Sequence, residues 1–297
     1  MRFAEIGQQL RAYRLESGLR AEEIAARLGV SRAALYRYEK GEVIKLDTVK
    51  RLGELLKVSP LSLLGIGVEY YSRSVGYFER VRQIEETADQ VLQACVGYCY
   101  LTTSDQFDVV LGDALAELAD TGGADNGATD RTALKTTADQ ITGLLAARKR
   151  SYLQRRFNII SILSGASVRA FLAQGLLAGA PLSDGMRARC RRAAAAEMAM
   201  VADLMEKEPM GLQFGLLPAA EIQSGFKILR NRDRATLAAS PFRPDSIPNQ
   251  QTGVAMITGA DEAVGAHQRV AEAMWRDATK GPAAAAALRD MLTVAAE

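Results

Sequence analysis

Residues 19–42 carry the clearest pattern in this chain and read Leu19-Arg-Ala-Glu-Glu-Ile-Ala-Ala-Arg-Leu-Gly-Val-Ser-Arg-Ala-Ala-Leu-Tyr-Arg-Tyr-Glu-Lys-Gly-Glu42. Ile24 and Leu28 are spaced as on one face of a helix, and we expect Gly29 to end that helix, because glycine readily adopts the left-handed conformation found at helix ends. Ser31 is a favourable N-cap for the next helix. Two short helices joined by a tight turn that contains glycine form a helix-turn-helix.

The second of these helices, predicted from Arg32 to about Lys40, has two different faces. Leu35 and Tyr38 are three residues apart and point toward the core of the domain. The opposite face carries Arg32, Ala33, Tyr36, Arg37 and Lys40. Arginine can bond to guanine O6 and N7 in the major groove, and an alanine methyl or an aromatic ring can contact a thymine methyl. The first four residues of this face are therefore the predicted base-reading residues.

Basic residues around this face, together with Ser31, are candidates for contacts to DNA phosphates. They are Arg11, Arg14, Arg20, Ser31, Lys40 and Lys45. Residues 1–64 hold 12 Lys/Arg against 8 Asp/Glu, a net charge of +4, which suits a polyanion. This block predicts double-stranded DNA as a partner. The alternative is a helical domain that only contacts other proteins.

This segment resembles the helix-turn-helix of the Cro/C1 phage-repressor family, also called the xenobiotic-response-element family. The resemblance rests on Leu-Gly-Val-Ser at the turn, on Arg-Tyr-Glu-Lys-Gly after it, and on small or apolar residues at Ala25, Gly29 and Leu35. Residues 46–64 are similar to the family's fourth and fifth helices. The resemblance covers about the first 65 residues and implies an all-α, lambda-repressor-like DNA-binding domain over 1–65.

Two positions depart from the family pattern. Arg20-Ala21 stands where the family commonly has Thr-Gln, and the resemblance implies that such a glutamine helps to clamp a phosphate. Ala21 cannot do this, and Arg20 is the candidate to replace it. Tyr36 stands where the family usually has a small residue, so the target DNA sequence cannot be transferred from relatives.

The next segment, residues 66–120, is expected to be a helical connector. Its apolar residues advance by three or four positions as on a long helix: Tyr71, Val75, Phe78, Val81, Ile84, Ala88, Val91 and Cys95. This helix could pack on a second copy of the chain or on its own C-terminal domain, and the sequence favours neither. Residues 121–131 contain three glycines and no periodic apolar residue, which predicts a loop.

Residues 132–297 are predicted to form an α+β domain around a small sheet. A helix to about residue 156 precedes a strand at 157–163, and helices follow to residue 174 and over 184–207. Strands are expected at 212–217, 226–230, 235–239 and 254–258, and helices at 261–278 and 282–295. The element order and the run Gly253-Val-Ala-Met-Ile-Thr-Gly-Ala-Asp-Glu-Ala-Val264 faintly resemble an uncharacterised domain attached to actinobacterial helix-turn-helix proteins, which implies no chemistry.

Two features of this domain predict an anion or ligand site, and each has a simpler alternative. Ser164 and Ser167 flank a turn whose backbone amides could bind an anion, or Ser164 is an ordinary N-cap. Arg155 and Arg156 belong to residues 141–192, which hold 10 Lys/Arg against one acid, a net of +9. They could bind a phosphorylated ligand, or they face residues 65–140, whose net charge is −8.

Composition limits the remaining classes of function. Three cysteines and one histidine exclude a zinc finger, a zinc-protease motif and a disulfide scaffold, so no metal or other cofactor is expected. No phosphate loop, dinucleotide fingerprint or nucleophile elbow is present, which predicts no enzymatic activity. No apolar run reaches about 18 residues, and the opening residues do not read as a signal peptide, so a cytoplasmic protein without a membrane partner is expected.

These observations predict a cytoplasmic bacterial transcription regulator. We expect a homodimer, because one recognition helix reads few base pairs and two half-sites multiply specificity. A repressor is favoured because blocking a promoter needs no polymerase contact, and a small effector or partner protein is expected to act on the C-terminal domain. The alternatives are an antitoxin-like interaction protein, which a copurified partner would favour, and an enzyme domain tethered to DNA, which a pocket of converging ionisable groups would favour.

Overall fold

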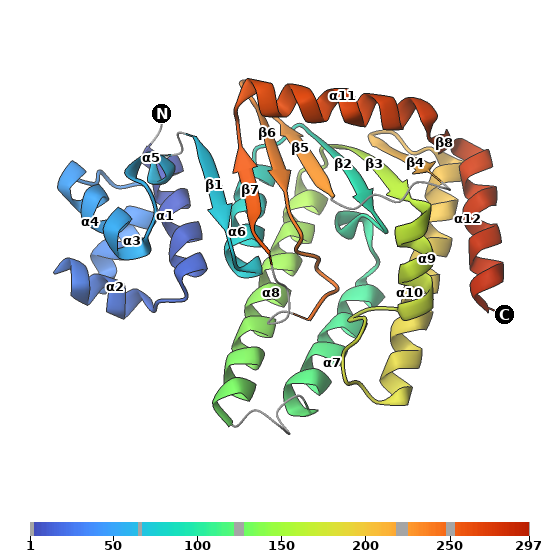
Figure 1. Ribbon diagram of the computed structural model, residues 1–297, viewed down its shortest axis with the longest axis horizontal. Coiled ribbons are helices and arrows are strands. Elements are labelled where there is room, and N and C mark those ends of the chain that lie inside the picture. Colours follow the sequence, from blue (N-terminus) through green and yellow to red (C-terminus); the bar gives the residue numbers. More distant parts are fainter. Residues whose placement is uncertain (1–2, 65–66, 122–127, 218–224, 248–252, 297) are drawn as a thin grey trace.

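The computed structural model describes residues 3–64, 67–121, 128–217, 225–247 and 253–296 of the 297-residue chain (Figure 1). In these residues a group of N-terminal helices lies beside a larger domain built on one mixed sheet. The predicted multidomain class, an all-α domain followed by an α+β domain, is confirmed. None of the helices in these ranges combines the length and apolar character that crossing a membrane requires.

The N-terminal domain is built from short helices, as the apolar spacing predicts. They are α1 (Phe3–Ser17), α2 (Ala21–Leu28), α3 (Arg32–Glu39), α4 (Leu46–Leu56) and α5 (Pro60–Leu63). Each contributes to one apolar core, whose almost fully buried members include Leu10, Tyr13, Ile24, Leu35, Leu52 and Leu63. Helix α3 is therefore anchored through its inner face.

The sheet has the strand order β1-β7-β6-β5-β2-β3-β4-β8 in the described residues. Its strands are β1 (Val68–Tyr71), β2 (Gln90–Val96), β3 (Asn158–Ser164), β4 (Leu212–Leu217), β5 (Phe226–Arg230), β6 (Ala235–Ala239), β7 (Ala255–Thr258) and β8 (Thr279–Lys280). β2, β3 and β4 run parallel, and the other pairs are antiparallel. The predicted strands are present. The sheet is larger than expected because β1 and β2 come from the segment predicted to be helical and because the short β8 was not predicted.

Helices cover the two faces of the sheet unequally (Figure 1). One face packs against α6 (Ser74–Glu85), α7 (Asp105–Thr121), α8 (Ala128–Gln154), α9 (Gly165–Gln174), α10 (Asp184–Lys207) and α12 (Gly281–Ala296), and the other against α11 (Asp261–Asp277). Val91 belongs to the first core and Leu92 to the second, because successive side chains of a strand point to opposite faces.

The long helix predicted from Tyr71 to Cys95 is wrong at its start, where Tyr71 ends β1, and over its second half. α6 ends at Glu85, and residues 90–96 form β2 in the interior of the sheet. Val91 and Leu92 of β2 are buried on opposite faces of the sheet, so the strand lacks the alternation of apolar and polar residues that would have distinguished it from a helix.

α6 does not offer a surface to a second copy of the chain. Every residue of this helix is buried except Arg82, which is partly buried. The helix packs between α1 and α8 of its own chain, as one of the two alternatives proposed. Of the two alternatives left open for this helix, α6 adopts packing on its own chain.

The loop predicted at 121–131 lies partly outside the described residues. Thr121 ends α7, residues 122–127 are not described, and α8 begins at Ala128. The last residues of the predicted loop are therefore helical.

Ion pairs join the acidic block, residues 65–140, to the basic block, residues 141–192. They are Arg148–Glu85 at 2.8 Å, Lys149–Asp108 at 2.5 Å, Arg155–Asp89 at 2.7 Å and Arg189–Asp113 at 2.7 Å. The uneven charge along the sequence is thus compensated within the fold. This agrees with the alternative that the basic run faces the acidic block.

Candidate nucleic-acid interface

The turn between α2 and α3 has the geometry that its sequence predicts. Gly29 lies in the left-handed region with φ 70° and ψ 30°, and its backbone N–H donates to Ala26 O at 3.1 Å. Ser31 Oγ accepts a hydrogen bond from the backbone N–H of Ala34 at 3.1 Å. These two caps fix where α2 ends and α3 begins, and so fix the orientation of α3 in the domain.

α1 supports α3 from behind through a very close approach at Gly7. A Cβ placed on Gly7 would lie 2.5 Å from the carbonyl oxygen of Tyr38 and 2.6 Å from that of Glu39. Both neighbours are backbone atoms of α3 and its end, which cannot move aside as a flexible side chain can. A larger residue at position 7 therefore has to separate the two helices.

We expect Gly7→Ala to lower the free energy of unfolding by about 1–3 kcal/mol, because overpacking against backbone outweighs the gain in helix propensity. Denaturant unfolding followed by circular dichroism measures the change. Gly143→Ala is the matched control, since Gly143 lies within α8 and a Cβ there would meet nothing within 4 Å. This control should stabilise the protein by about 0.5–1 kcal/mol. Similar effects of the two substitutions would contradict the close approach.

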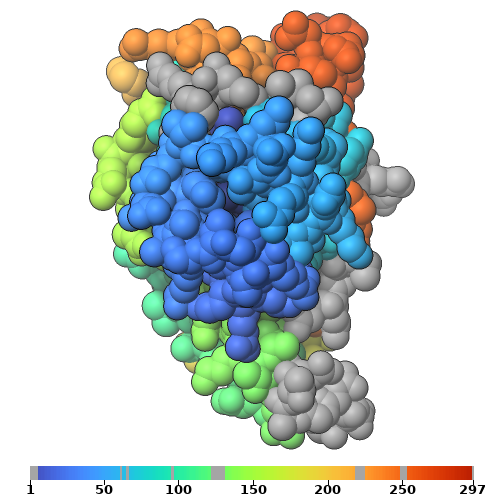
Figure 2. Space-filling model, turned by 90° about the vertical axis from the view of Figure 1, so that its left-hand side faces the viewer, coloured from blue at the N-terminus to red at the C-terminus, as the bar shows by residue number. Residues whose placement is uncertain are grey.

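The predicted base-reading residues lie together on α3, and their face is open. The Arg32 and Arg37 side chains are each 59% exposed, Ala33 is exposed and Tyr36 is partly buried. Figure 2 shows the N-terminal helices, in blue, projecting in front of the rest of the molecule. Arg32, Ala33 and Arg37 are therefore not covered by other parts of the described chain.

Both arginines of this face have acidic partners that sequence analysis did not identify. Arg32 Nη1 lies 2.7 Å from Glu22 Oε1, and Arg37 Nε lies 3.2 Å from Glu42 Oε2. Exposed ion pairs of this kind contribute little to stability, so a base or phosphate can replace the carboxylate at small cost. Only the folding of α2 against α3 brings Glu22 to Arg32, so spacing along the sequence carried no signal for that pair.

The predicted phosphate contacts divide into two groups. Arg20, Ser31, Lys40 and Lys45 are exposed around the N-terminal domain. Arg14 is different: its side chain is 13% exposed, and its guanidinium bonds to both carboxylate oxygens of Glu39 at 2.5 and 3.1 Å. Arg11 is about half exposed but pairs with Glu79 of α6 at 2.8 Å. The structure thus engages Arg11 and Arg14 within the protein and leaves the other four on the surface.

A buried polar network attaches α1 to β1 and α6. Glu69 on β1 accepts two hydrogen bonds from Arg80 at 2.9 and 3.0 Å, one from Gln9 Nε2 at 2.6 Å and one from the Tyr71 hydroxyl at 2.7 Å. The rings of Tyr13 and Tyr71 stack beside it with centroids 5.4 Å apart. The helix-turn-helix is therefore docked on the larger domain by oriented polar contacts as well as by apolar packing.

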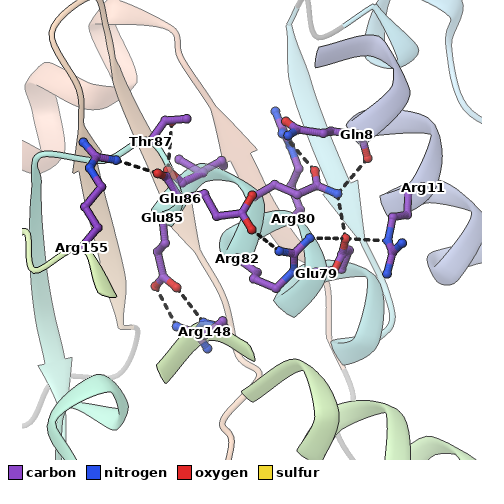
Figure 3. Close-up of polar contacts among 12 residues, drawn as sticks. Gln8, Arg11, Glu79, Arg80, Arg82, Glu85, Glu86, Thr87, Arg148 and Arg155 are labelled. Atoms are coloured by element: carbon purple, nitrogen blue, oxygen red, sulfur yellow. Dashed lines mark hydrogen bonds and ion pairs between the residues drawn. The ribbon is translucent and has the colours of Figure 1, made fainter. Parts of the chain in front are cut away.

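A second carboxylate, Glu79, completes this attachment (Figure 3). It bonds to Arg82 through both oxygens at 2.9 Å, to Arg11 at 2.8 Å and to Gln83 Nε2 at 3.0 Å. Gln83 Nε2 also donates to the backbone oxygen of Gln8 on α1 at 3.0 Å. Burial alone would raise the pKa of Glu79, but the hydrogen bonds and charge of Arg82 and the charge of Arg11 outweigh it, and the pKa is lowered. Glu79 is therefore ionised near neutral pH.

The opposite side of α6 carries a buried ion cluster against the sheet. Glu85 accepts two hydrogen bonds of 2.8 Å from Arg148 on α8 (Figure 3). Lys227 Nζ lies 3.8 Å from Glu85 Oε1. Burial raises the pKa of Glu85, but the charge and hydrogen bonds of Arg148 exceed this effect and lower it. Burial and the positive charge of Arg148 lower the pKa of Lys227. α6 thus contacts the helix-turn-helix on one side and the core of the larger domain on the other.

The two predicted anion-binding features, Ser164 with Ser167 and Arg155 with Arg156, lie at opposite ends of β3. Ser164 ends β3 and caps α9, with its Oγ accepting from the Ser167 N–H at 3.3 Å. Arg155 and Arg156 precede the opposite end of β3, and Arg155 bonds to Asp89 at 2.7 Å and to the backbone oxygen of Glu86. A seven-residue strand separates the two ends by about 20 Å. A single anion cannot contact both.

The described cysteines and the histidine are packed in the protein interior or against neighbouring side chains. Cys99 and Cys190 are buried free thiols, and burial raises the pKa of each. The side chain of Cys95 lies outside what the structure describes. His267 Nδ1 lies 2.9 Å from the Ala263 carbonyl, and its ring packs edge-on against Phe226. The described residues contain no cluster of three or more His, Cys, Asp or Glu placed to hold a metal ion.

Comparison with known proteins supports the interpretation of α1 to α5. Residues 5–64 match a family model described as a helix-turn-helix domain. The N-terminal segment is a helix-turn-helix domain. A Pyrococcus horikoshii protein named as a candidate HTH-type transcriptional regulatory protein is 44% identical over 62 residues. The aligned region is 20% of this chain and 20% of that protein, so the likeness is confined to this domain.

A likeness to a solved structure extends further but is weak. The structure of TrmBL2, an archaeal chromatin protein, aligns with 92% of this chain and 93% of its own chain, at 11% identity and a TM-score of 0.33. A score this low does not assign a fold to the sheet domain.

Proposed function

We propose that this protein is a sequence-specific DNA-binding transcription regulator of the Cro/C1 type. The observation that carries the proposal is the open face of α3, where Arg32, Ala33 and Arg37 are exposed on a helix whose ends are capped as in a helix-turn-helix. The family match over residues 5–64 and the regulator name of the P. horikoshii relative support it. A DNA partner also requires a location in the compartment that holds the chromosome, the cytoplasm of a bacterium.

The proposal includes a repressor that acts as a homodimer. A single α3 reads only a few base pairs, and two half-sites about one helical turn apart supply the specificity that a genome requires. Blocking a promoter needs no contact to the polymerase. Because α6 is buried, the dimer surface has to lie elsewhere on the chain. The sheet domain is proposed to bind an effector or partner protein rather than to catalyse a reaction, and no cofactor is proposed.

Selection from a pool of random DNA sequences tests the central claim. We expect the full chain to enrich one sequence motif with two similar halves, and its affinity to fall steeply with salt because phosphate contacts release counterions. Absence of enrichment, or binding that salt does not affect, would contradict the proposal. In that case copurification of a protein partner would favour the antitoxin-like alternative.

Arg37→Ala is expected to weaken binding to the selected site by about 1–3 kcal/mol and to relax preference at one base pair, because a bidentate contact to guanine is lost. Fluorescence anisotropy on the selected site and its single-base variants measures both effects. Arg192→Ala, which removes an exposed arginine of α10 far along the chain, is the control. Unchanged base preference in the Arg37 variant would remove Arg37 from the base-reading set.

A further inference from the structure

Tyr36 contacts two arginines that sequence analysis assigned to different tasks. The Arg32 guanidinium lies 5.3 Å from the centre of the Tyr36 ring, and the Arg14 guanidinium lies 5.9 Å from it. Both distances are in the range of cation–π contacts. Tyr36 therefore lies between the outer surface of α3 and the buried Arg14–Glu39 pair.

The Arg14–Glu39 pair gives the tyrosine a rigid support. The Glu39 side chain is 4% exposed, and Arg14 meets both of its oxygens with two nitrogens. Two hydrogen bonds from one guanidinium to one carboxylate fix the plane of the guanidinium. Gly7 brings α1 close enough to α3 for Arg14 to reach Glu39, since a Cβ at Gly7 would overlap the backbone there. The position of the Tyr36 ring is thus set by the core of the domain.

Arg32 is in turn restrained by Tyr36. It lies one turn before the tyrosine, and its Nε and Nη2 donate to the Tyr36 hydroxyl at 3.4 and 3.3 Å. Its Nη1 pairs with Glu22 at 2.7 Å. A guanidinium has five N–H groups, and the hydrogen bonds to the Tyr36 hydroxyl use two of them. At least one further N–H remains on each terminal nitrogen, and guanine O6 and N7 accept one each.

Arg37 provides an internal comparison on the same helix. Its side chain is exposed to the same extent as that of Arg32, and its nearest carboxylate is Glu42 at 3.2 Å. Arg32 has an aromatic ring, a hydroxyl and a carboxylate around it. An arginine that is already ordered loses less conformational freedom when it binds.

We propose that Tyr36 is a positioning residue, which orients Arg32 for the readout of one guanine instead of reading a base itself. The inference rests on the proposed function, because it concerns how the same face discriminates between DNA sequences. Arg14 and Glu39 act indirectly: Glu39 holds the Arg14 guanidinium, and Arg14 packs against the Tyr36 ring. Arg14 then has no role as a phosphate contact.

The test compares base discrimination among full-length variants on the DNA site selected by the unaltered protein. Arg32→Ala first identifies the base pair that Arg32 reads, and Arg37→Ala identifies a second one. Tyr36→Leu is expected to reduce discrimination about tenfold at the Arg32 base pair and less than twofold at the Arg37 base pair. Tyr36→Phe keeps the ring and its packing but loses the hydroxyl, and it should give a smaller loss at the same base pair.

Two further readouts separate positioning from a direct base contact or a general loss of structure. The double variant Arg32→Ala/Tyr36→Leu should discriminate no worse at that base pair than Arg32→Ala alone, since Tyr36 acts through Arg32. The salt dependence of binding should not change, because no phosphate contact is lost. Additive effects of the two substitutions, or equal losses at every base pair in the well-folded Tyr36→Phe variant, would overturn the inference while leaving DNA binding intact. If the unaltered protein selects no sequence, the proposed function fails and this inference fails with it.

Discussion

Replacing Arg80 by alanine is expected to lower the free energy of unfolding by about 3–5 kcal/mol. Arg80 supplies two of the hydrogen bonds to Glu69, and both side chains are almost completely buried, at 8% and 7% exposure. Without Arg80 the carboxylate keeps only Gln9 and the Tyr71 hydroxyl as donors. An ion left unpaired in the interior costs far more than an exposed pair contributes.

Denaturant unfolding of the full chain measures this effect, with Arg192→Ala as the exposed control, which should change stability by less than about 0.5 kcal/mol. The double variant Glu69→Gln/Arg80→Met removes both charges together and should recover much of the loss, because a buried ion pair is replaced at little net cost. Hydrogen exchange in α1 should accelerate in Arg80→Ala, since this network attaches α1 to β1 and α6. A loss below about 1 kcal/mol in the single variant would contradict the buried network.

Arg148→Ala is expected to be similarly destabilising, by about 3–5 kcal/mol near neutral pH, and its cost should depend on pH. In the unaltered protein the pKa of Glu85 is lowered, so its ionisation contributes stability above the ordinary carboxyl pKa, and this contribution is lost as the pH falls through the folded value. Without Arg148, burial dominates and raises the folded pKa, so the charged form becomes a penalty at neutral pH.

The difference in unfolding free energy between Arg148→Ala and the unaltered protein should therefore shrink as the pH falls from about 7 toward 4. Lys227, 3.8 Å from Glu85, offsets part of the loss. Lys227→Met is the matched control: it removes the other cation while Arg148 keeps both bonds to Glu85, so it should change stability by less than about 1 kcal/mol. A cost of Arg148→Ala that stays constant over this pH range would show that Glu85 is not the group left unpaired.

The ion pairs of Glu79 and Glu85 place α6 between the helix-turn-helix and the sheet domain, which bears on how an effector could act in the proposed function. α6 contacts α1 through Glu79 and α8 through Glu85, so it joins the helix-turn-helix to the core of the sheet domain, and we expect a displacement of α6 to be passed on to the helix-turn-helix. An effector can shift the protein between states only if it binds one of them better.

The local sequence was sufficient to predict most of the helices and strands. The N-terminal helices, the caps at Gly29 and Ser31 and the helices and strands after residue 157 follow from apolar spacing and turn residues, because these signals act over a few positions. β2 was not predicted, since a strand buried on both faces has no alternation to detect. The exposure of Arg32, Ala33 and Arg37 on α3 was predicted, whereas the acidic partners of the two arginines were not.

From its amino-acid order alone, this chain specified a helix-turn-helix with a cationic face at its N-terminus, because helix periodicity, capping and turn chemistry are encoded in neighbouring residues. Only the tertiary structure decided that Arg14 supports Tyr36, that Arg11 pairs with Glu79, and that the basic residues near 148 neutralise the acidic segment before them. The physical reason is that a charge's partner is set by which residues folding brings within a few ångströms, across separations of 25 to about 70 positions here.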